Sequence, residues 1–118
     1  MAEILIVEDA SLQQAVIRGF LEPEHTVTGT VTDGGKAVEF VDENGVDVVI
    51  MDINLDGMDG ITAAERIRSH SPETEIIVST ALVDEELQQA AKSVPIQEYL
   101  IKPYSGPELR DAIEQALR

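Results

Sequence analysis

Continuous apolar runs alternate along this chain with apolar residues at helical spacing. Runs at residues 3–8 and 46–51 predict two buried strands, because strands covered on both faces are apolar throughout. Residues 75–80 predict a further strand, and residues 97–101 predict a short last one. Residues 26–31 alternate polar and apolar, as expected of a less buried edge strand. The helix-spaced residues are Leu12, Ala15, Val16 and Phe20; Ala37, Phe40 and Val41; Ile61, Ala64 and Ile67; Leu87, Ala90, Ala91 and Val94; and Leu109, Ala112, Ile113, Ala116 and Leu117. The pattern predicts an α/β domain of five βα units, doubly wound, with helices on both faces of a parallel sheet.

Local signals mark several element boundaries. Gly34-Gly35 predicts a break before the second helix, and Pro95 is expected to follow the end of the fourth. Ser105 and Glu108 form a capping box at the start of the last helix. These signals leave the strand order open, and 2-1-3-4-5 is one of two common orders for such sheets.

Reactive side chains stand at or just beyond the ends of four predicted strands. They are Glu8 and Asp9, Asp52, Thr80, and Lys102. Because parallel strands end at one edge of the sheet, where ligands gather, these groups are expected to share one pocket. Three carboxylates in one pocket repel one another, so the pocket should attract a hard dication. Mg²⁺ suits a site with few carboxylates, several waters and a phosphate oxygen.

Composition limits the classes of function. The 118 residues have 43% hydrophobic content and a net charge of −15, which favours one folded domain and argues against direct nucleic-acid binding. No apolar stretch approaches about 18 residues, so no membrane span is expected. No basic segment typical of a signal peptide is visible at the amino-terminus. The lack of cysteine excludes disulfides and thiolate catalysis, and it fits a cytoplasmic protein.

Five short motifs make the chain resemble the response regulator receiver domain of two-component signalling. They are Glu8-Asp9, Asp52 after its apolar run, Met58-Asp59-Gly60, Thr80-Ala81, and Tyr99-x-x-Lys102-Pro103. The resemblance covers residues 1–118, which are expected to form a single stand-alone receiver without an output domain. It implies a flavodoxin-like sheet of order 2-1-3-4-5.

The resemblance also implies that Asp52 accepts a phosphoryl group from a phosphohistidine on a partner. A carboxylate can attack phosphorus without prior deprotonation. Asp9, Asp52 and the backbone carbonyl of Asn54 would bind Mg²⁺, with Glu8 acting through water. The simpler alternatives are that Glu8 and Asp9 cap the first helix and that Asp52 is an ordinary loop aspartate.

Thr80, Lys102 and Tyr99 are expected to respond to the phosphoryl group. Lys102 offers a point charge and Thr80 a hydroxyl donor, and in phosphoryl transfer positioning and charge neutralisation supply most of the catalysis. In the family, an aromatic residue at the position of Tyr99 moves inward when the threonine turns toward the phosphoryl group. A half-buried strand tyrosine is the alternative. The family also favours a cis Lys102–Pro103 bond.

Some residues carry no assignment or depart from the family pattern. Asp56-Gly57 stands where the family often has a proline, which predicts a more flexible and more acidic loop. His25 and His70 lack a partner pattern, and Tyr104 is expected to be a loop or packing residue.

The expected function is a phosphorylation switch. A sensor histidine kinase or a phosphotransfer protein would supply the phosphoryl group, and residues 84–118 would change their binding of a downstream protein or of a second copy of the chain. Such a chain is not a conventional enzyme, although it catalyses its own phosphorylation and dephosphorylation.

Three alternatives belong to other classes. An aspartate phosphatase of the haloacid dehalogenase type needs a second acid two residues after the nucleophile, whereas position 54 is Asn. A flavodoxin-like nucleotide or flavin binder needs a phosphate-binding loop, whereas acids follow the first strand. A degenerate receiver would serve only as an interaction module.

Overall fold

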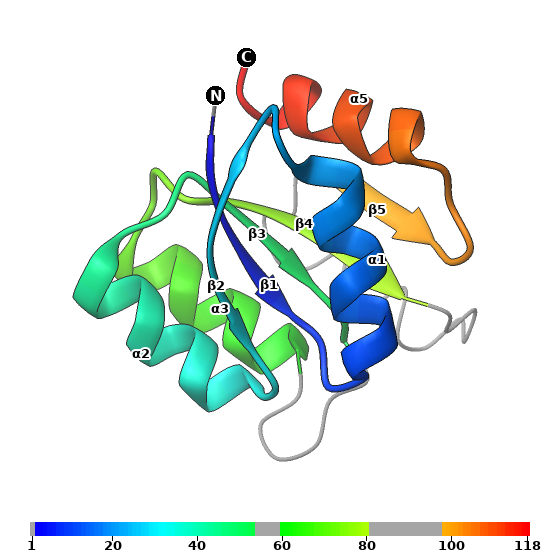
Figure 1. Ribbon diagram of the computed structural model, residues 1–118. Helices are drawn as coiled ribbons and strands as arrows, with labels where there is room; N and C mark the ends of the chain where they lie inside the picture. The colour runs from blue at the N-terminus through cyan, green and yellow to red at the C-terminus, as the bar shows by residue number, and fades with distance from the viewer. Residues whose placement is uncertain (1, 54–59, 81–97) are drawn as a thin grey trace.

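Five parallel strands form one sheet in the order β2-β1-β3-β4-β5 (Figure 1). The computed structural model describes residues 2–53, 60–80 and 98–118. The strands are β1 (Glu3–Val7), β2 (Thr26–Val31), β3 (Val48–Met51), β4 (Glu75–Thr80) and β5 (Glu98–Ile101). The predicted fold class is confirmed, and every predicted strand is present within two residues of its expected bounds.

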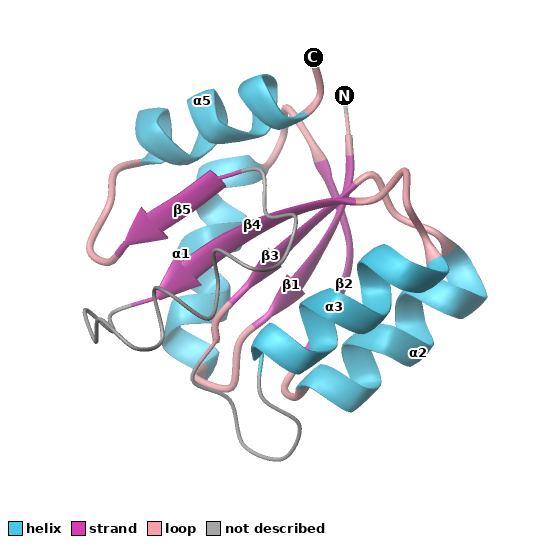
Figure 2. Ribbon diagram, turned by 180° about the vertical axis from the view of Figure 1, so that it is seen from behind, coloured by secondary structure: helices cyan, strands magenta, loops and turns pink. Residues whose placement is uncertain are grey.

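Four described helices cover the two faces of the sheet. They are α1 (Ser11–Leu21), α2 (Gly34–Asn44), α3 (Gly60–His70) and α5 (Gly106–Ala116). Helices α1 and α5 lie on one face, and α2 and α3 lie on the other (Figures 1 and 2). The helix predicted around residues 87–94 lies outside the described residues.

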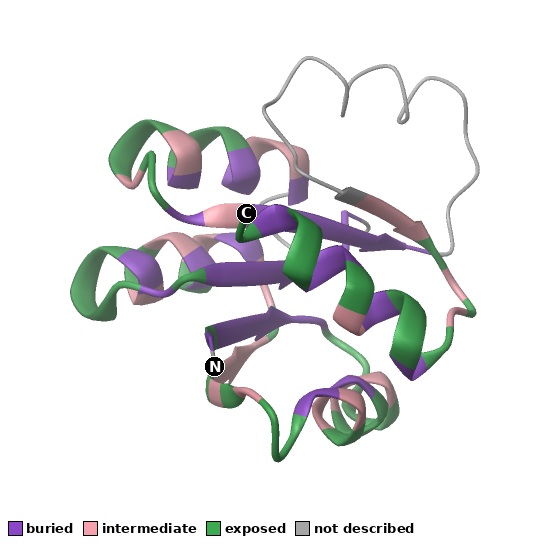
Figure 3. Cartoon of the chain, turned by 90° about the horizontal axis from the view of Figure 1, so that it is seen from above, coloured by how far each residue is buried: buried purple, intermediate pink, exposed green. Residues whose placement is uncertain are grey.

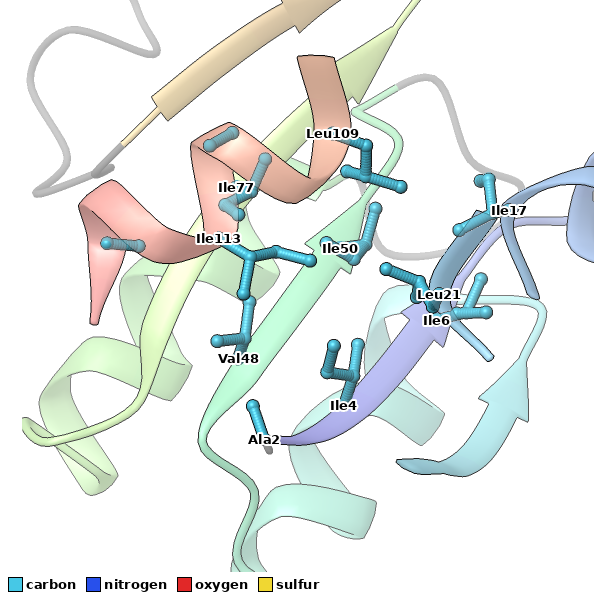
Figure 4. Packing of buried hydrophobic residues seen from close by; sticks show 12 residues of the cluster. Ala2, Ile4, Ile6, Ile17, Leu21, Val48, Ile50, Ile77, Leu109 and Ile113 are labelled. Atoms are coloured by element: carbon cyan, nitrogen blue, oxygen red, sulfur yellow. The ribbon is translucent and has the colours of Figure 1, made fainter. Parts of the chain in front are cut away.

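Each face of the sheet has its own apolar core. The core under α1 and α5 contains Ala2, Ile4, Ile6, Ile17, Leu21, Val48, Ile50, Ile77, Leu109, Ala112, Ile113 and Ala116 (Figure 4). The core under α2 and α3 contains Leu5, Val7, Ala37, Val41, Val46, Val49, Met51, Ala63, Ala64, Ile67 and Ile76. Strands β1, β3 and β4 are therefore buried on both faces, while the outer sides of the helices are exposed (Figure 3). Burial on both faces explains why these strands have continuous apolar runs.

The predicted inward face of α1 is wrong. Ile17 and Leu21 are buried, whereas Leu12 is 73% exposed and Val16 is 40% exposed. Phe20 of the predicted stripe packs only partly against the core. Leu12, Val16 and Phe20 form one set of apolar residues at helical spacing, and Ile17 and Leu21 form a second set one position further along. The spacing therefore predicts a helix but does not decide which set faces the sheet.

The glycine pair does not break the chain before α2. Gly34 is the first residue of the helix, and Asp33 caps it by accepting the Lys36 backbone N–H at 2.8 Å. Glycine is costly mainly in the middle of a helix, where its backbone loses the most conformational freedom, whereas Gly34 and Gly35 stand at the start of α2. The helix ends at Asn44, and Gly45 is its C-cap, with a φ of 67° that glycine adopts readily.

The predicted capping box at α5 is confirmed, and it gives a stability prediction. Ser105 Oγ accepts the Glu108 backbone N–H at 3.2 Å, and Glu108 Oε1 accepts the Ser105 backbone N–H at 3.2 Å. Ser105→Ala should lower the free energy of unfolding in urea by about 1 kcal/mol, because one N–H of the first turn loses its acceptor. Ser11→Ala, an exposed site in the first turn of α1 that is not its cap, should change it less. Equal losses in the two variants would contradict this role for Ser105.

Both ends of the chain lie at the end of the sheet opposite the carboxyl ends of the strands (Figures 1 and 2). Residues 2 and 118 are thus remote from the edge where the sequence places the reactive groups. None of the described helices has the length and apolar character required to cross a lipid bilayer.

Candidate functional site

The three predicted carboxylates converge at the carboxyl end of the sheet. Strands β1 and β3 are neighbours, with Val7 paired to Met51, so Glu8 and Asp52 follow at the same level. The Asp52 backbone N–H donates to Val7 O at 3.1 Å. One oxygen each of Glu8, Asp9 and Asp52 lie within 4.8 Å of one another. Glu8 is 2% exposed and Asp52 is 9% exposed, while Asp9 faces solvent.

Lys102 extends into this cluster from the loop after β5. Its Nζ donates to Glu8 Oε1 and, at 3.3 Å, to Asp52 Oδ2. Burial by itself would lower the pKa of Lys102, but the hydrogen bond to Glu8 and the charges of Asp52 and Glu8 outweigh it and hold that pKa above its usual value. The amine is therefore a cation at neutral pH, and it offsets part of the repulsion among the acids.

Backbone contacts fix the loop that carries Glu8. The Glu8 N–H donates to Val31 O at 3.0 Å, and its carbonyl oxygen accepts from Gln14 Nε2 at 2.5 Å. Helix α1 has Ala10 at its N-cap and no capping side chain. Glu8 Oε2 accepts the N–H of this N-cap residue at 3.3 Å, but neither acid is itself the N-cap, so the alternative in which the acidic pair caps the helix is met only in part. Gln14 was missed from the sequence because it acts through a backbone carbonyl, which leaves no residue pattern.

Thr80 and Tyr99 lie on neighbouring strands beside the cluster. Thr80 is fully buried, and its carbonyl oxygen accepts the Lys102 backbone N–H at 2.8 Å. Tyr99 pairs with Val78 and is half-buried, and its buried hydroxyl has no hydrogen-bond partner among the described residues. Burial raises the pKa of Tyr99. These positions fit the alternative of a half-buried strand tyrosine, and the switch role of Tyr99 stays a prediction.

Other expected features fall partly outside the described residues. Asn54, the predicted source of a backbone ligand, lies there, as do Asp56 and Gly57. The Lys102–Pro103 bond is cis, as the resemblance implied.

Two groups of contacts were not foreseen. Ser79 Oγ and Tyr104 Oη form a hydrogen bond of 2.5 Å, although only packing was expected of Tyr104. Both histidines have partners: His25 Nδ1 accepts the Ala2 N–H at 3.1 Å, and His70 Nδ1 lies 3.3 Å from Asp42 Oδ1. His70 is also the last residue of α3.

Gly60 lies against the backbone that carries Asp52. A Cβ atom at this position would stand 2.5 Å from both Asp52 O and Ile53 Cα, so any larger residue must displace the backbone. Gly60→Ala should lower the free energy of unfolding by about 1–3 kcal/mol, measured by urea denaturation.

Gly19 in α1 is the matched control for this change. Nothing lies within 4 Å of a Cβ placed there, so Gly19→Ala should raise stability by up to about 1 kcal/mol. If the Gly60→Ala protein were as stable as the unaltered chain, the backbone at Asp52 and Ile53 would be able to move without loss of free energy of unfolding, which would contradict the prediction.

Comparison with known proteins decides the family. Residues 4–114 match the family model of the response regulator receiver domain. The chain belongs to this family. The receiver is 31% identical to the chemotaxis protein CheY of Halobacterium salinarum, over 98% of this chain and 96% of that protein. It is also 31% identical to the transcriptional regulatory protein LiaR of Bacillus subtilis, covering 98% of this chain but only 56% of LiaR.

A solved structure adds a metal-bound example. The receiver domain of the sensor histidine kinase PA1611 from Pseudomonas aeruginosa, described with a magnesium ion coordinated in its active-site cleft, has 30% identity and a TM-score of 0.89. The match covers 98% of this receiver and 97% of that chain. The family consists of phosphoacceptor domains of two-component signalling and not of conventional enzymes.

Proposed function

We propose that this receiver is a phosphorylation-dependent switch in which Asp52 takes a phosphoryl group from a phosphohistidine. The donor would be a sensor histidine kinase or a phosphotransfer protein. The observation that carries the proposal is the convergence of Glu8, Asp9 and Asp52 with the Lys102 amine, together with family membership. An Asp52 oxygen forms a bond to phosphorus, the P–N bond of the phosphohistidine breaks, and the imidazole nitrogen leaves with the electron pair.

The donor set fits Mg²⁺. Three carboxylates within 4.8 Å of one another offer hard oxygen ligands, and the exposure of Asp9 gives water access to one side. Asp9 and Asp52 would hold the ion, the Asn54 backbone carbonyl would add a ligand, and Glu8 would act through water. When bound, the ion neutralises negative charge on the phosphoryl oxygens.

Lys102 and Thr80 would bind the phosphoryl oxygens. The Lys102 amine already lies 3.3 Å from Asp52 Oδ2, so a small displacement brings it to an oxygen of a group attached there. Thr80 would rotate its hydroxyl toward the same group. The same residues would orient the water that later hydrolyses the aspartyl phosphate, so the chain would catalyse its own dephosphorylation.

Residues 84–118 are proposed to form the surface whose binding of a partner changes when Asp52 is phosphorylated. Tyr99 would follow the rotation of Thr80, and the described part of this surface exposes two apolar side chains, Ile101 (39%) and Leu117 (46%). A downstream protein or a second copy of the chain would bind residues 84–118 in the state that phosphorylation favours.

Acetyl phosphate and Mg²⁺ test the proposal directly. The expected result is the addition of one phosphoryl group, found by intact-mass spectrometry and located on Asp52 by peptide mapping, which a chelator prevents. No added mass, and no change in the NMR spectrum with beryllofluoride and Mg²⁺, would instead favour an interaction module that does not use its acidic site.

A further inference from the structure

A partly buried hydrogen bond connects the end of β4 to the loop that carries Lys102. Ser79 is 1% exposed, and its Oγ lies 2.5 Å from Oη of Tyr104, two residues beyond Lys102. Burial raises the pKa of the Tyr104 phenol, against the opposing effects of the Ser79 hydrogen bond and the Lys102 charge, so the phenol remains neutral at pH 7. A buried hydroxyl such as that of Ser79 is costly to leave without a partner, and its hydrogen bond therefore holds the Tyr104 hydroxyl in place.

The same loop has a second attachment to β4. The Lys102 backbone N–H donates to Thr80 O at 2.8 Å, directly next to Ser79 in the strand. Residues 102–104 are thus fastened at both ends to two consecutive residues of β4. The ring of Tyr104 also packs against Phe20 of α1, with ring centroids 6.4 Å apart, which holds the far side of the loop.

We propose that Ser79 and Tyr104 form a positioning pair for Lys102, holding the base of its side chain so that the amine meets the phosphoryl group on Asp52. This inference rests on the proposed function. Lysine has a long, flexible stem, so its amine is placed accurately only when its backbone and neighbours are fixed. The amine must also exchange Glu8 and Asp52 oxygens for phosphoryl oxygens without leaving the site.

Removal of either hydroxyl tests the pair. Tyr104→Phe keeps the ring packing on Phe20, and Ser79→Ala keeps the strand. Each should slow phosphorylation of Asp52 by acetyl phosphate about two- to tenfold, the range that one neutral hydrogen bond supports. The double variant should be no slower than the more affected single variant, and Ser79→Thr, which retains a hydroxyl, should restore most of the rate.

Thr74→Val is the matched control at the other end of β4. It removes a buried hydroxyl that donates to Val46 O at 2.9 Å, directly before β4 begins and thus at the opposite end of that strand from the site. It should lower the melting temperature about as much as Ser79→Ala but leave the phosphorylation rate unchanged. A rate that falls with stability in all three variants would overturn the inference.

A double-mutant cycle with Lys102→Met separates positioning from general loosening of the fold. If the pair acts through the amine, Tyr104→Phe should have little further effect on the rate once Lys102 is Met. A loss of the same factor in both backgrounds would contradict positioning.

The two proposals fail in different ways. If the unaltered chain takes up no phosphoryl group, the switch and the positioning pair are both rejected. If it does take up the group, and Tyr104→Phe does so equally fast, only the positioning pair is rejected.

Discussion

Asp52→Ala should abolish phosphoryl uptake, with a loss on the order of 10⁴-fold or more in rate, as expected when a nucleophile is removed. Asp52 is 9% exposed, and its Oδ2 lies 3.3 Å from the Lys102 amine. Asp52 and Glu8 are thus the two carboxylates that pair with this cation. Alanine also removes one of three mutually repelling charges. The variant should therefore fold, with Lys102 still paired to Glu8. Intact mass after incubation with acetyl phosphate and Mg²⁺ measures the loss.

Asp111→Ala is the control for this experiment. Asp111 is an exposed acid on α5, and its loss changes the net charge equally without altering the site. It should be phosphorylated like the unaltered chain. Retained phosphoryl uptake in Asp52→Ala would place the nucleophile elsewhere, and peptide mapping would identify it.

Lys102→Met should slow phosphorylation of Asp52 about 10²- to 10³-fold, the loss typical of one preorganised group that stabilises transition-state charge. Methionine keeps much of the apolar stem but leaves Glu8 and Asp52 without their cation. Because Lys102 no longer competes for these oxygens, Mg²⁺ should bind more tightly. The initial phosphorylation rate should therefore fall, while the Mg²⁺ affinity measured by calorimetric titration should rise.

Lys36→Met is the matched control. Lys36 belongs to α2, and its side chain is 62% exposed. Its Nζ lies 3.9 Å from Asp33 Oδ2. Its removal should alter neither the phosphorylation rate nor Mg²⁺ binding, because exposed ion pairs contribute little. If Lys102→Met weakened Mg²⁺ binding, the amine would be supporting the acidic cluster and not competing with the ion.

The strands and the acidic cluster could be predicted from the sequence for one shared reason. Continuous apolar runs locate strands buried on both faces, and parallel strands bring whatever follows them to one edge of the sheet. Glu8 and Asp52 are 44 residues apart in the chain, yet the pairing of Val7 with Met51 brings them to the same level. This part of the site follows from topology, which the apolar pattern and the family resemblance together indicate.

The buried face of α1 and the hydrogen bonds around the site could not be predicted in the same way. Two apolar sets one residue apart in α1 have the same period, and packing against the sheet and α5 selects Ile17 and Leu21. The Ser79–Tyr104 bond depends on how a loop closes over a strand end, and neither residue belongs to a periodic pattern. Gln14 binds a carbonyl, which every residue possesses.

The positions of the two ends of the chain have a practical consequence. Since residues 2 and 118 lie at the end of the sheet away from Asp52, an affinity tag, a fluorescent protein or a sensor-chip linker joined to either end would point away from the acidic opening. An immobilised receiver should thus present Asp52 and the neighbouring acids to bulk solution and to a docking phosphoryl donor. Kinetics measured on such a surface can then be compared with those of the free protein.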